Sequence, residues 1–566
     1  MLLRPARAIR ILSKANFKLL IIIRMSSSSP ITNTEEFNIV KEGKAQILFP
    51  KQETVFYNPI QQFNRDLSVI CIKAWDNLYG RTRKEHKRDT GRVGETDSTE
   101  PEQKKPKLND ASASKGDNYI RILEALSATG LRAIRYAHEI PHVKQIVAND
   151  LLPAAVESIS RNIEFNNVAH VVTANQGDAN AVMHQHNMRG KRFHIIDLDP
   201  YGTAAPFLDA AVQAVEEGGL LLVTCTDLAV LAGNSYPEKC YALYGGVNMA
   251  GHNATHESAL RLLLHSIASS AAKYKRCIEP LLSLSIDYYV RVFVRVRTSP
   301  IEVKLLQSRT ILTYYCSQCG AYHNQPLGRV VTKESTGNKK YMLSQGPPVD
   351  RRCRYCGGAY HVAGPMWAGS LHNAEFLKEV LRINNSEKPS NNDDDGETEE
   401  VYGTRKRIEG MVTVASSELL DTPFYFSPNR LASILKLQVP PIKTVAAGLG
   451  SLGYRCSLTH AQPATIKTDA PWEAIWYVMI ESDLEAKKRL EEKGTELLKE
   501  TQPGYKIRAN IGNWASLSDD TLGFPKDKPS FQANSQSRSI ERLRKLKIVR
   551  YQENPTKNWG PKSRPK

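Results

Sequence analysis

Four of the nine cysteines stand in two matched pairs whose spacing suits metal binding. Cys316 and Cys319, and then Cys353 and Cys356, each enclose two residues, and a glycine follows each pair. Four thiolates suit tetrahedral zinc and leave no coordination position open for catalysis. A redox C-x-x-C motif needs no matching second pair. The spacing therefore predicts a structural zinc site, and we expect the five scattered cysteines to be buried apolar residues.

Acidic or small-residue turns follow four consecutive strand-like segments. A small-residue turn from Ser127 to Gly130 leads into a helix, so a ligand can approach its backbone. Asp150, which follows the next strand, suits the hydroxyl groups of a ribose. Asp178 and the backbone amide of Ala179 suit the edge of an adenine. One acid in a turn is weak evidence, because Asp is common there, but four such turns in order predict a nucleotide-like cofactor.

The fourth turn reads Asp197-Leu198-Asp199-Pro200-Tyr201-Gly202. Its D-P-Y-G is similar to the D/N-P-P-Y signature of enzymes that methylate exocyclic amines of nucleobases. The lone pair of such an amine is delocalised into the ring, so a carboxylate must accept an N–H bond to restore nucleophilicity. The proline fixes the turn, and Tyr201 can stack on the base. Because the first turn lacks G-x-G-x-x-G, we expect a class I S-adenosylmethionine methyltransferase rather than a dinucleotide enzyme.

A literal G-x-G-x-x-G does occur later, from Gly448 to Gly453. No strand precedes it, so we predict a helix terminus there rather than a phosphate-binding loop.

An alternating pattern between residues 119 and 297 positions the four turns. Strand-like runs at 119–126, 145–149, 171–174, 193–198 and 220–224 alternate with helical stretches at 131–139, 153–165, 204–215 and 257–274. A strand pair at 281–287 and 290–297 closes the series. This pattern predicts an α/β, Rossmann-like, doubly wound sheet with its ligand at the carboxyl ends of the strands. A C-terminal α+β domain would carry the zinc site.

The composition describes a globular protein with an uneven distribution of charge. The chain has 566 residues, 41% of them hydrophobic, and a formal net charge of +17. No apolar run is long enough to span a bilayer, and an odd number of cysteines indicates a reducing compartment. Residues 1–34 contribute +6 and residues 525–566 contribute +9, which leaves +2 for the rest.

The charged ends and two polar inserts divide the chain. Residues 1–34 are basic and acid-free, as in a mitochondrial transit peptide, and a second start at Met25 would produce a nuclear form without them. Residues 81–118 form an insert predicted to be disordered, in which Lys104–Lys107 resembles a weak nuclear-import signal. We expect a first domain at 35–299, which contains the alternating pattern, and a second domain at 300–524 with an acidic linker at 384–400. The basic tail, 525–566, is either a nucleic-acid contact or a solvated tail.

These motifs together resemble those of the eukaryotic tRNA (guanine-N2)-dimethyltransferases, which convert guanosine 26 of tRNA to N2,N2-dimethylguanosine. The resemblance covers residues 35–525. Besides the two turns 127–132 and 197–202 it rests on Phe56-Tyr57-Asn58-Pro59, Asn64-Arg65-Asp66, Gly364-Pro365-Met366-Trp367 and Ser457-Leu458-Thr459-His460.

The resemblance implies roles for individual residues. Arg65 and Arg132 would contact the methionine end of S-adenosylmethionine, and a guanidinium suits that carboxylate. Asp150 would hold the ribose, and Asp178 with Ala179 the adenine. Asp199 would accept the target amine, with Asp197 as the second candidate. Phe56 and Tyr57 would line the pocket or belong to the core.

The implied reaction is methyl transfer to one nitrogen twice, with the guanine extruded from its stack. The resemblance also implies that tRNA is the partner, that 35–299 is the catalytic domain, and that 300–524 is the tRNA-binding domain. Two other interpretations stay open from the residues alone. One is amine methylation of another nucleic acid or of a protein glutamine. The other is a zinc-containing RNA-binding module that keeps the fold without catalysis. Oligomeric state is left open.

Overall fold

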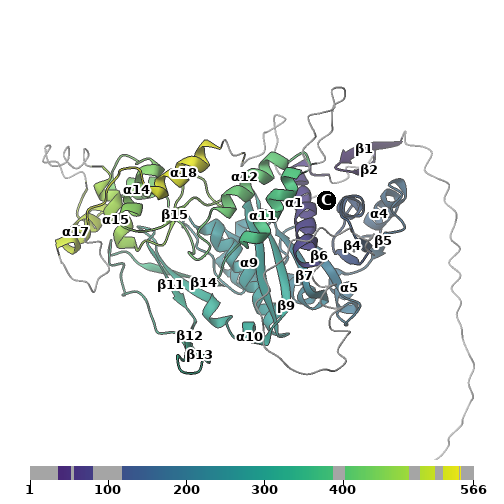
Figure 1. Ribbon diagram of the computed structural model, residues 1–566, viewed down its shortest axis with the longest axis horizontal. Helices are drawn as coiled ribbons and strands as arrows, with labels where there is room; N and C mark the ends of the chain where they lie inside the picture. The colour runs from purple at the N-terminus through teal and green to yellow at the C-terminus, as the bar shows by residue number, and fades with distance from the viewer. Residues whose placement is uncertain are drawn as a thin grey trace, which may run out of the picture.

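Figure 1 shows the computed structural model of the chain. The structure describes residues 36–51, 57–80, 118–386, 402–483, 498–516, 527–546 and 549. The expected targeting segment 1–34, residue Phe56, nearly all of the insert 81–118, most of the linker and the end of the basic tail lie outside the described residues.

A seven-stranded sheet forms the centre of the N-terminal half. Its order is β5-β4-β3-β6-β7-β9-β8. The strands are β3 (Ile120–Glu124), β4 (Val143–Asp150), β5 (Val172–Gln176), β6 (Phe193–Leu198), β7 (Val215–Cys225), β8 (Arg276–Ile286) and β9 (Tyr289–Thr298). The strands β3 to β7 are parallel, and β9 runs antiparallel between β7 and β8. The predicted doubly wound sheet is confirmed.

Helices cover both faces of this sheet, which explains why its strands read as nearly continuous apolar runs. One face packs against α5 (Ala179–Gln185), α6 (Leu208–Ala214) and α9 (Thr255–Ala272). The other packs against α1 (Gln62–Trp75), α3 (Leu131–Glu139) and α4 (Pro153–Phe165). The ranges predicted for α3 and α4 match, whereas α6 is shorter than predicted because a 3-10 turn (Ala205–Phe207) precedes it and Val215 already begins β7.

Short elements surround this core. The hairpin of β1 (Phe37–Glu42) and β2 (Ala45–Pro50) lies beside α4, where the Leu48 amide donates to Asn162 Oδ1 at 2.9 Å. The remaining short helices are Pro59–Gln61, Asp76–Gly80, α7 (Leu228–Leu231), α8 (Pro237–Tyr244), α10 (Pro300–Val303) and Gln307–Arg309.

The C-terminal half has an α+β arrangement and an apolar cluster of its own, and residues such as Ile311 and Met366 also belong to the cluster of the N-terminal sheet. The C-terminal half contains a sheet of order β11-β10-β14 and two hairpins, β12/β13 and β15/β16. The strands are β10 (Thr310–Cys316), β11 (Tyr322–Pro326), β12 (Gly328–Thr332), β13 (Lys339–Leu343), β14 (Tyr360–Trp367), β15 (Cys456–Ser457) and β16 (Lys467–Thr468). The helices are α13 (Pro428–Leu435), α14 (Ile442–Ser451), α15 (Trp472–Glu481), α17 (Pro503–Ser516) and α18 (Ser535–Lys545).

Two helices from the C-terminal half of the sequence pack on the N-terminal core. Helices α11 (Ala374–Ser386) and α12 (Arg405–Ser416) share a cluster of buried residues with α1, and Figure 1 shows the three side by side. The prediction that an acidic linker begins at residue 384 is wrong at its start. Asn384 is buried in α11 and donates to the Arg405 carbonyl at 3.3 Å, so the helix continues to Ser386.

The predicted helix terminus at the G-x-G-x-x-G stretch is confirmed, because α14 ends at Ser451 and Gly453 has a φ of +89°. Its glycines serve packing. A Cβ on Gly448 would lie 2.9 Å from the Phe531 ring, and one on Gly450 would lie 2.9 Å from the Asn534 side chain. The start of the basic tail therefore lies against α14, where its helix α18 buries Ile540.

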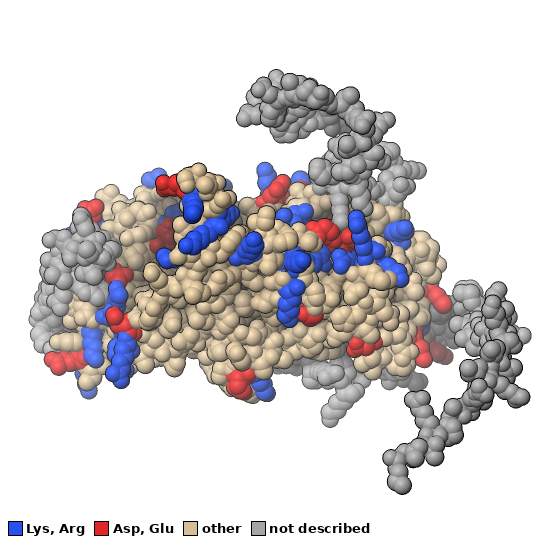
Figure 2. Space-filling view, turned by 90° about the horizontal axis from the view of Figure 1, so that it is seen from below, with Lys and Arg blue, Asp and Glu red and all other residues tan. Residues whose placement is uncertain are grey.

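Charge is mixed over the body of the molecule. On the face in Figure 2, Lys and Arg side chains occur together with Asp and Glu. This agrees with the near-neutral middle of the sequence. Within the described ranges, no helix is both long enough and apolar enough to cross a membrane.

Candidate active site and metal centre

Three of the expected cofactor residues, Asp150, Asp178 and Ala179, lie at the carboxyl ends of β4 and β5, next to the turn that follows β3. Asp150 accepts the Ala128 amide at 2.9 Å from the first turn and the Leu152 amide at 3.0 Å from its own. Asn149 donates to the carbonyls of Ala125 and Gly177, both at 3.0 Å. Hydrogen bonds thus join the three strand-end turns into one edge.

This edge presents both polar and apolar groups. Asp178 is exposed and caps α5 by accepting the Ala181 amide at 2.9 Å, and Ala179 behind it is buried. Leu151 and Leu152, directly after Asp150, are 63% and 62% exposed. Large apolar side chains beside carboxylates form a surface that suits a nucleoside. The base of the nucleoside can pack on the two leucines, and its ribose hydroxyl groups can donate to Asp150.

The two carboxylates at the end of β6 have different surroundings. Asp199 pairs with Arg132 and accepts the Asn64 amide at 3.4 Å, and both contacts fall on Oδ2. Among the described residues no hydrogen bond falls on Asp199 Oδ1, and the side chain is 22% exposed. One oxygen of Asp199 is therefore held in place, while the other is available to a ligand.

Asp197 is buried and fully engaged. It accepts the Tyr136 hydroxyl at 2.5 Å and Arg291 Nη1 at 2.9 Å, and Arg132 Nη1 lies 3.5 Å away. Burial alone would raise the pKa of Asp197, but the guanidinium groups of Arg291 and Arg132 lower it. Asp197 is thus an ionised anchor for Arg132 rather than an acceptor for substrate.

Arg132 lies at the centre of the carboxylate cluster. Besides Asp197 and Asp199 it approaches Glu124, with 3.8 Å between Nε and Oε1, and it donates to Ser68 at 3.1 Å. Burial raises the pKa of Glu124 to about 8. At neutral pH Arg132 therefore lies between the ionised Asp197 and a largely protonated Glu124, with Asp199 as its third carboxyl partner.

The structure pairs Arg65 with a residue that the sequence did not single out. Arg65 donates through Nε and Nη2 to Glu42, at 2.6 and 2.5 Å, and lies over the Tyr57 ring at 5.4 Å. Tyr57 in turn donates to Glu42 at 3.1 Å. Glu42 also accepts Arg135 at 2.8 Å. An isolated glutamate in an edge strand carries no sequence signal, so only the fold identifies this contact.

The loop after Asp199 is anchored to the loop after β7. Tyr201 is 51% exposed, and the next residue, Gly202, donates its amide to Thr226 Oγ1 at 2.8 Å. The Tyr244 hydroxyl bonds to Thr203 at 2.7 Å and donates to Asp227 at 2.8 Å. Sequence reasoning missed Asp227, although it follows a strand as Asp178 and Asp199 do.

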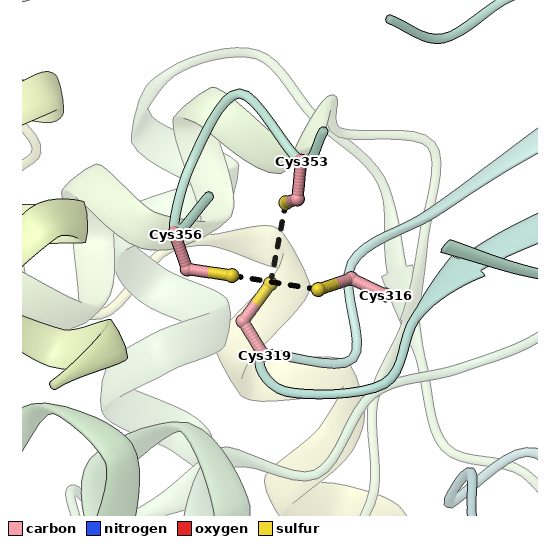
Figure 3. A group of neighbouring side chains, drawn as sticks. All are labelled: Cys316, Cys319, Cys353 and Cys356. Carbon is pink, nitrogen blue, oxygen red and sulfur yellow. Dashed lines mark hydrogen bonds between the residues drawn. The ribbon is translucent and has the colours of Figure 1, made fainter. Parts of the chain in front are cut away.

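The two cysteine pairs meet, as Figure 3 shows, with their sulfur atoms directed toward one another. The four Sγ atoms lie within 4.8 Å of one another, with 3.4 Å between Cys316 and Cys356 and 3.7 Å between Cys319 and Cys353. These distances exceed the roughly 2 Å of a disulfide bond. They approach the roughly 3.8 Å between two sulfurs of a tetrahedral zinc site with Zn–S bonds of about 2.3 Å.

The two knuckles have the same backbone hydrogen bonds. The first cysteine of each accepts the amide of the glycine four residues on, at 3.0 Å for Gly320 and 2.7 Å for Gly357. Its own amide donates to the carbonyl five residues on, at 2.8 and 2.9 Å. Both glycines have a positive φ, near +75°, which explains the glycine after each pair. Repetition of one turn around buried thiols fits a metal ion held by both pairs.

A second buried group, His372, Glu418 and His460, has a different character. Each histidine accepts a backbone amide of β8 through one ring nitrogen, so the other nitrogen carries a proton. His460 donates that proton to Glu418 at 2.6 Å. Lys467 Nζ already lies 3.2 Å from Glu418 and 3.0 Å from Glu257 on α9. We interpret the group as an ion-pair network between the two halves rather than a metal site.

The strand order, the antiparallel β9 and the acids at the strand ends define the class of the N-terminal half, which is that of the class I S-adenosylmethionine methyltransferases. A solved structure of Trm1 from Pyrococcus horikoshii in complex with S-adenosyl-L-methionine resembles the chain with a TM-score of 0.57 and 26% identity. The match covers 79% of this chain and 99% of that one. The expected fold is confirmed.

The comparison of sequences identifies the family. The model of the family "N2,N2-dimethylguanosine tRNA methyltransferase" matches residues 33–480, and the chain belongs to this family. The mitochondrial tRNA (guanine(26)-N(2))-dimethyltransferase of Saccharomyces cerevisiae is 59% identical over 98% of this chain and 95% of its own length. The Schizosaccharomyces pombe enzyme is 45% identical over 93% and 92%, and the human enzyme 39% identical over 93% and 77%. At 59% identity the chain is a relative of the yeast enzyme, not that protein itself.

Proposed function

We propose that this chain transfers two methyl groups from S-adenosylmethionine to N2 of guanosine 26 in tRNA. Membership of the family and the resemblance to the complex with S-adenosyl-L-methionine support this proposal. The observation that carries it is the asymmetry of Asp199, whose Oδ2 is held by Arg132 and Asn64 while Oδ1 has no partner among the described residues.

Asp199 acts on the amine in this proposal. Its open oxygen accepts an N2–H hydrogen bond, which keeps the nitrogen lone pair available, and it receives the proton that N2 loses when the new bond forms. Arg132, anchored by Asp197, keeps the Asp199 carboxylate oriented. Tyr201, half exposed beside Asp199, stacks on the guanine.

The edge formed by β3, β4 and β5 holds the cofactor. Asp150 binds the ribose, Asp178 and the Ala179 amide bind the adenine, and the exposed Leu151 and Leu152 contact its ring. Arg132 and the part of Arg65 not engaged by Glu42 bind the methionine carboxylate. When bound, S-adenosylmethionine supplies an electrophilic methyl group. The residues present fit this cofactor, because they offer carboxylates beside an uncovered apolar surface.

We infer that the four cysteines hold one structural zinc ion. The site lies where β10 ends and β14 begins, next to the apolar core of the C-terminal half. Four thiolates leave no open position, so the ion would fix the two knuckles and perform no catalysis. The C-terminal half, 300–524, would hold tRNA by its shape and its phosphates.

Helix α18 is the best candidate for a phosphate contact within the described part of the basic tail. Its Ile540 is buried against the C-terminal core, whereas Arg538, Arg542, Arg544 and Lys545 are exposed. A helix fixed by its apolar face presents these cations in a defined arrangement, which a solvated tail does not.

We propose mitochondrial and nuclear pools of the protein. The printed name of the Saccharomyces cerevisiae relative is mitochondrial, and residues 1–34 have the composition of a transit peptide. A chain started at Met25 would lack most of that segment. Replacing Met1 while keeping Met25 should remove the mitochondrial pool and leave the nuclear one. A mitochondrial pool that persists would contradict the proposal.

The decisive experiment compares the purified wild type with Asp199→Ala on tRNA transcripts that carry G26. The wild type should yield N2,N2-dimethylguanosine, as nucleoside mass spectrometry reports. Asp199→Ala should lose activity by roughly 10²- to 10⁴-fold while still binding S-adenosylmethionine. Asp209→Ala, which removes a partly exposed aspartate of α6, is the matched control and should remain active. Full activity of Asp199→Ala would overturn the catalytic assignment.

A further inference from the structure

Exposed tyrosines gather at the end of the sheet that carries Asp199. In the part of the chain whose side chains the structure describes, the exposed aromatic residues are all tyrosines, namely Tyr201, Tyr236, Tyr241, Tyr274 and Tyr288. Tyr201 follows β6, and Tyr236 and Tyr241 follow β7. Tyr288 lies in the turn between β8 and β9, and Tyr274 precedes β8.

The strand pairing places four of these tyrosines at one edge of the sheet. Because β6 and β7 are parallel, the residues that follow them leave the sheet at the same end. Cys225 at the end of β7 pairs with Val290 at the start of β9, so the turn that holds Tyr288 also lies there. Tyr274 lies at the opposite end, because Arg276 begins β8 beside the last residues of β9.

Helix α8 is tied directly to the loop that carries Asp199. The hydroxyl group of the buried Tyr244 bonds to Thr203 at 2.7 Å, and Tyr241 lies one turn before Tyr244 on this helix. The side chains of Tyr241 and Tyr288 are both 61% exposed. Two aromatic rings open to solvent therefore lie on the same edge as Asp199, one on α8 and one on the β8–β9 turn.

The charge of the segment between β7 and α9 favours contact with bases over contact with phosphates. The segment has three charged residues, Asp227, Glu238 and Lys239, so its formal charge is −1. Lys239 Nζ lies over the Tyr236 ring at 4.4 Å. An aromatic surface without an excess of positive charge can bind unpaired nucleotides by stacking, which tolerates every base.

Extrusion of a base uncovers the bases on either side of it. When a guanine leaves its stack, each neighbouring base loses a stacking partner, which is part of the cost of extrusion. A tyrosine ring can replace that contact. We propose that Tyr236, Tyr241 and Tyr288 form a tyrosine surface that stacks on the nucleotides next to guanosine 26. This inference rests on the proposed function and adds RNA contacts outside the pocket that holds the guanine.

The test measures the binding of two tRNA transcripts, one with guanine at position 26 and one abasic at that position. The abasic transcript leaves the neighbouring bases uncovered but offers no guanine to the pocket. Tyr241→Ala and Tyr288→Ala should each weaken the binding of both transcripts by about 5- to 100-fold. Tyr201→Ala should weaken only the binding of the transcript with guanine. The slope of log K against log salt should stay unchanged, because no variant removes a cation.

Matched variants separate stacking from other effects. Tyr241→Phe and Tyr288→Phe keep the ring without the hydroxyl group and should bind both transcripts like the wild type. Tyr274→Ala removes a tyrosine that is 40% exposed at the opposite end of the sheet, and it should also bind like the wild type. Because all these side chains are exposed, thermal melting and S-adenosylmethionine binding should not change.

Three outcomes would overturn the inference. One is an unchanged affinity for both transcripts in the Tyr241→Ala, Tyr288→Ala double variant, which would leave the surface to a partner other than RNA. Another is a Phe variant that binds as weakly as its Ala counterpart, which would assign the effect to the hydroxyl group. The third is a flatter salt slope, which would show a lost phosphate contact. Failure of the proposed function would appear instead as a wild type that forms no N2,N2-dimethylguanosine.

Discussion

Arg132 and Asp199 form an ion pair across the carboxyl ends of two neighbouring strands, although 66 residues separate them in the sequence. Arg132 begins α3 after β3, and Asp199 follows β6, which pairs with β3 in the sheet. Asp197 holds the same guanidinium from the other side at 3.5 Å. The proposed cofactor residue Arg132 is thus paired with the proposed catalytic residue Asp199, so binding of a ligand carboxylate to Arg132 would alter the restraint on Asp199.

The two aspartates of this cluster should respond differently to the same substitution. Asp199→Asn should lower kcat by 10²-fold or more with little change in the melting temperature, because its side chain is partly exposed. Asp197→Asn removes a buried charge from between Arg291 and Arg132 and should destabilise the protein by about 3–5 kcal/mol. Thermal melting and single-turnover rates on both variants check this. Equal melting temperatures would contradict the division of roles.

Acid should unfold the protein partly through Glu42. Burial alone would raise its pKa, but Arg65 and Arg135 lower it to about 2, from an ordinary value of 4.5. A lowered carboxyl pKa gives stability that is present above pH 4.5 and lost as the pH falls toward 2, about 3 kcal/mol in all. Melting temperatures between pH 7 and 3 should therefore fall less steeply in Glu42→Gln, which should start from a lower value at pH 7.

Each of the four clustered cysteines should be required for the metal. Metal analysis of protein purified without chelator should give one zinc per chain. Cys319→Ser or Cys356→Ser should reduce it and lower the melting temperature, because structural zinc contributes directly to folding. Cys456→Ser, which changes a buried thiol outside the cluster, is the control. A wild-type protein without zinc would refute the site.

Removal of Lys467 should uncouple the two halves of the molecule. Its ammonium lies 3.0 Å from Glu257 on α9 and 3.2 Å from Glu418, and all three are buried. Lys467→Met leaves two buried carboxylates near each other and should cost about 3–5 kcal/mol. Adding Glu418→Gln to Lys467→Met should recover part of that loss. Calorimetry of the single and double variants measures both effects.

Neutralising the exposed face of α18 should weaken tRNA binding without unfolding the helix. The variant changes Arg538, Arg542 and Arg544 to Gln and leaves Ile540 and its packing intact. A truncation at Pro525 would also remove Phe531, which packs against Gly448. The slope of log K against log salt should flatten by about 0.7–0.9 for each phosphate that the variant no longer neutralises. Lys333→Gln with Lys339→Gln on the β12/β13 hairpin provides a control of similar charge. An unchanged slope in the α18 variant would show that these arginines contact solvent rather than tRNA phosphates.

Local pattern predicted the elements of the fold well. The alternation of apolar runs and helical stretches gave the strands of the sheet and the full ranges of α3 and α4, because strands buried on both faces and amphipathic helices leave distinct periodicities. It did not predict that α11 and α12 lie against α1, since an amphipathic helix does not specify which apolar surface covers it. For the same reason the predicted start of the acidic linker, Asn384, falls inside α11.

The sequence by itself determined the chemistry available to this protein: the cysteine pairs, the acids at the strand ends and the D-P-Y-G turn are local patterns, whose spacing limits what they can bind. Only the tertiary structure distinguishes the surroundings of Asp197 from those of Asp199, because two carboxylates in one motif differ solely in what lies around them. Burial against Arg291 and Tyr136 engages the first, and partial exposure leaves an oxygen of the second open. Glu42, Asn64 and Lys467 likewise gain their roles from partners far away in the sequence, which no local pattern records.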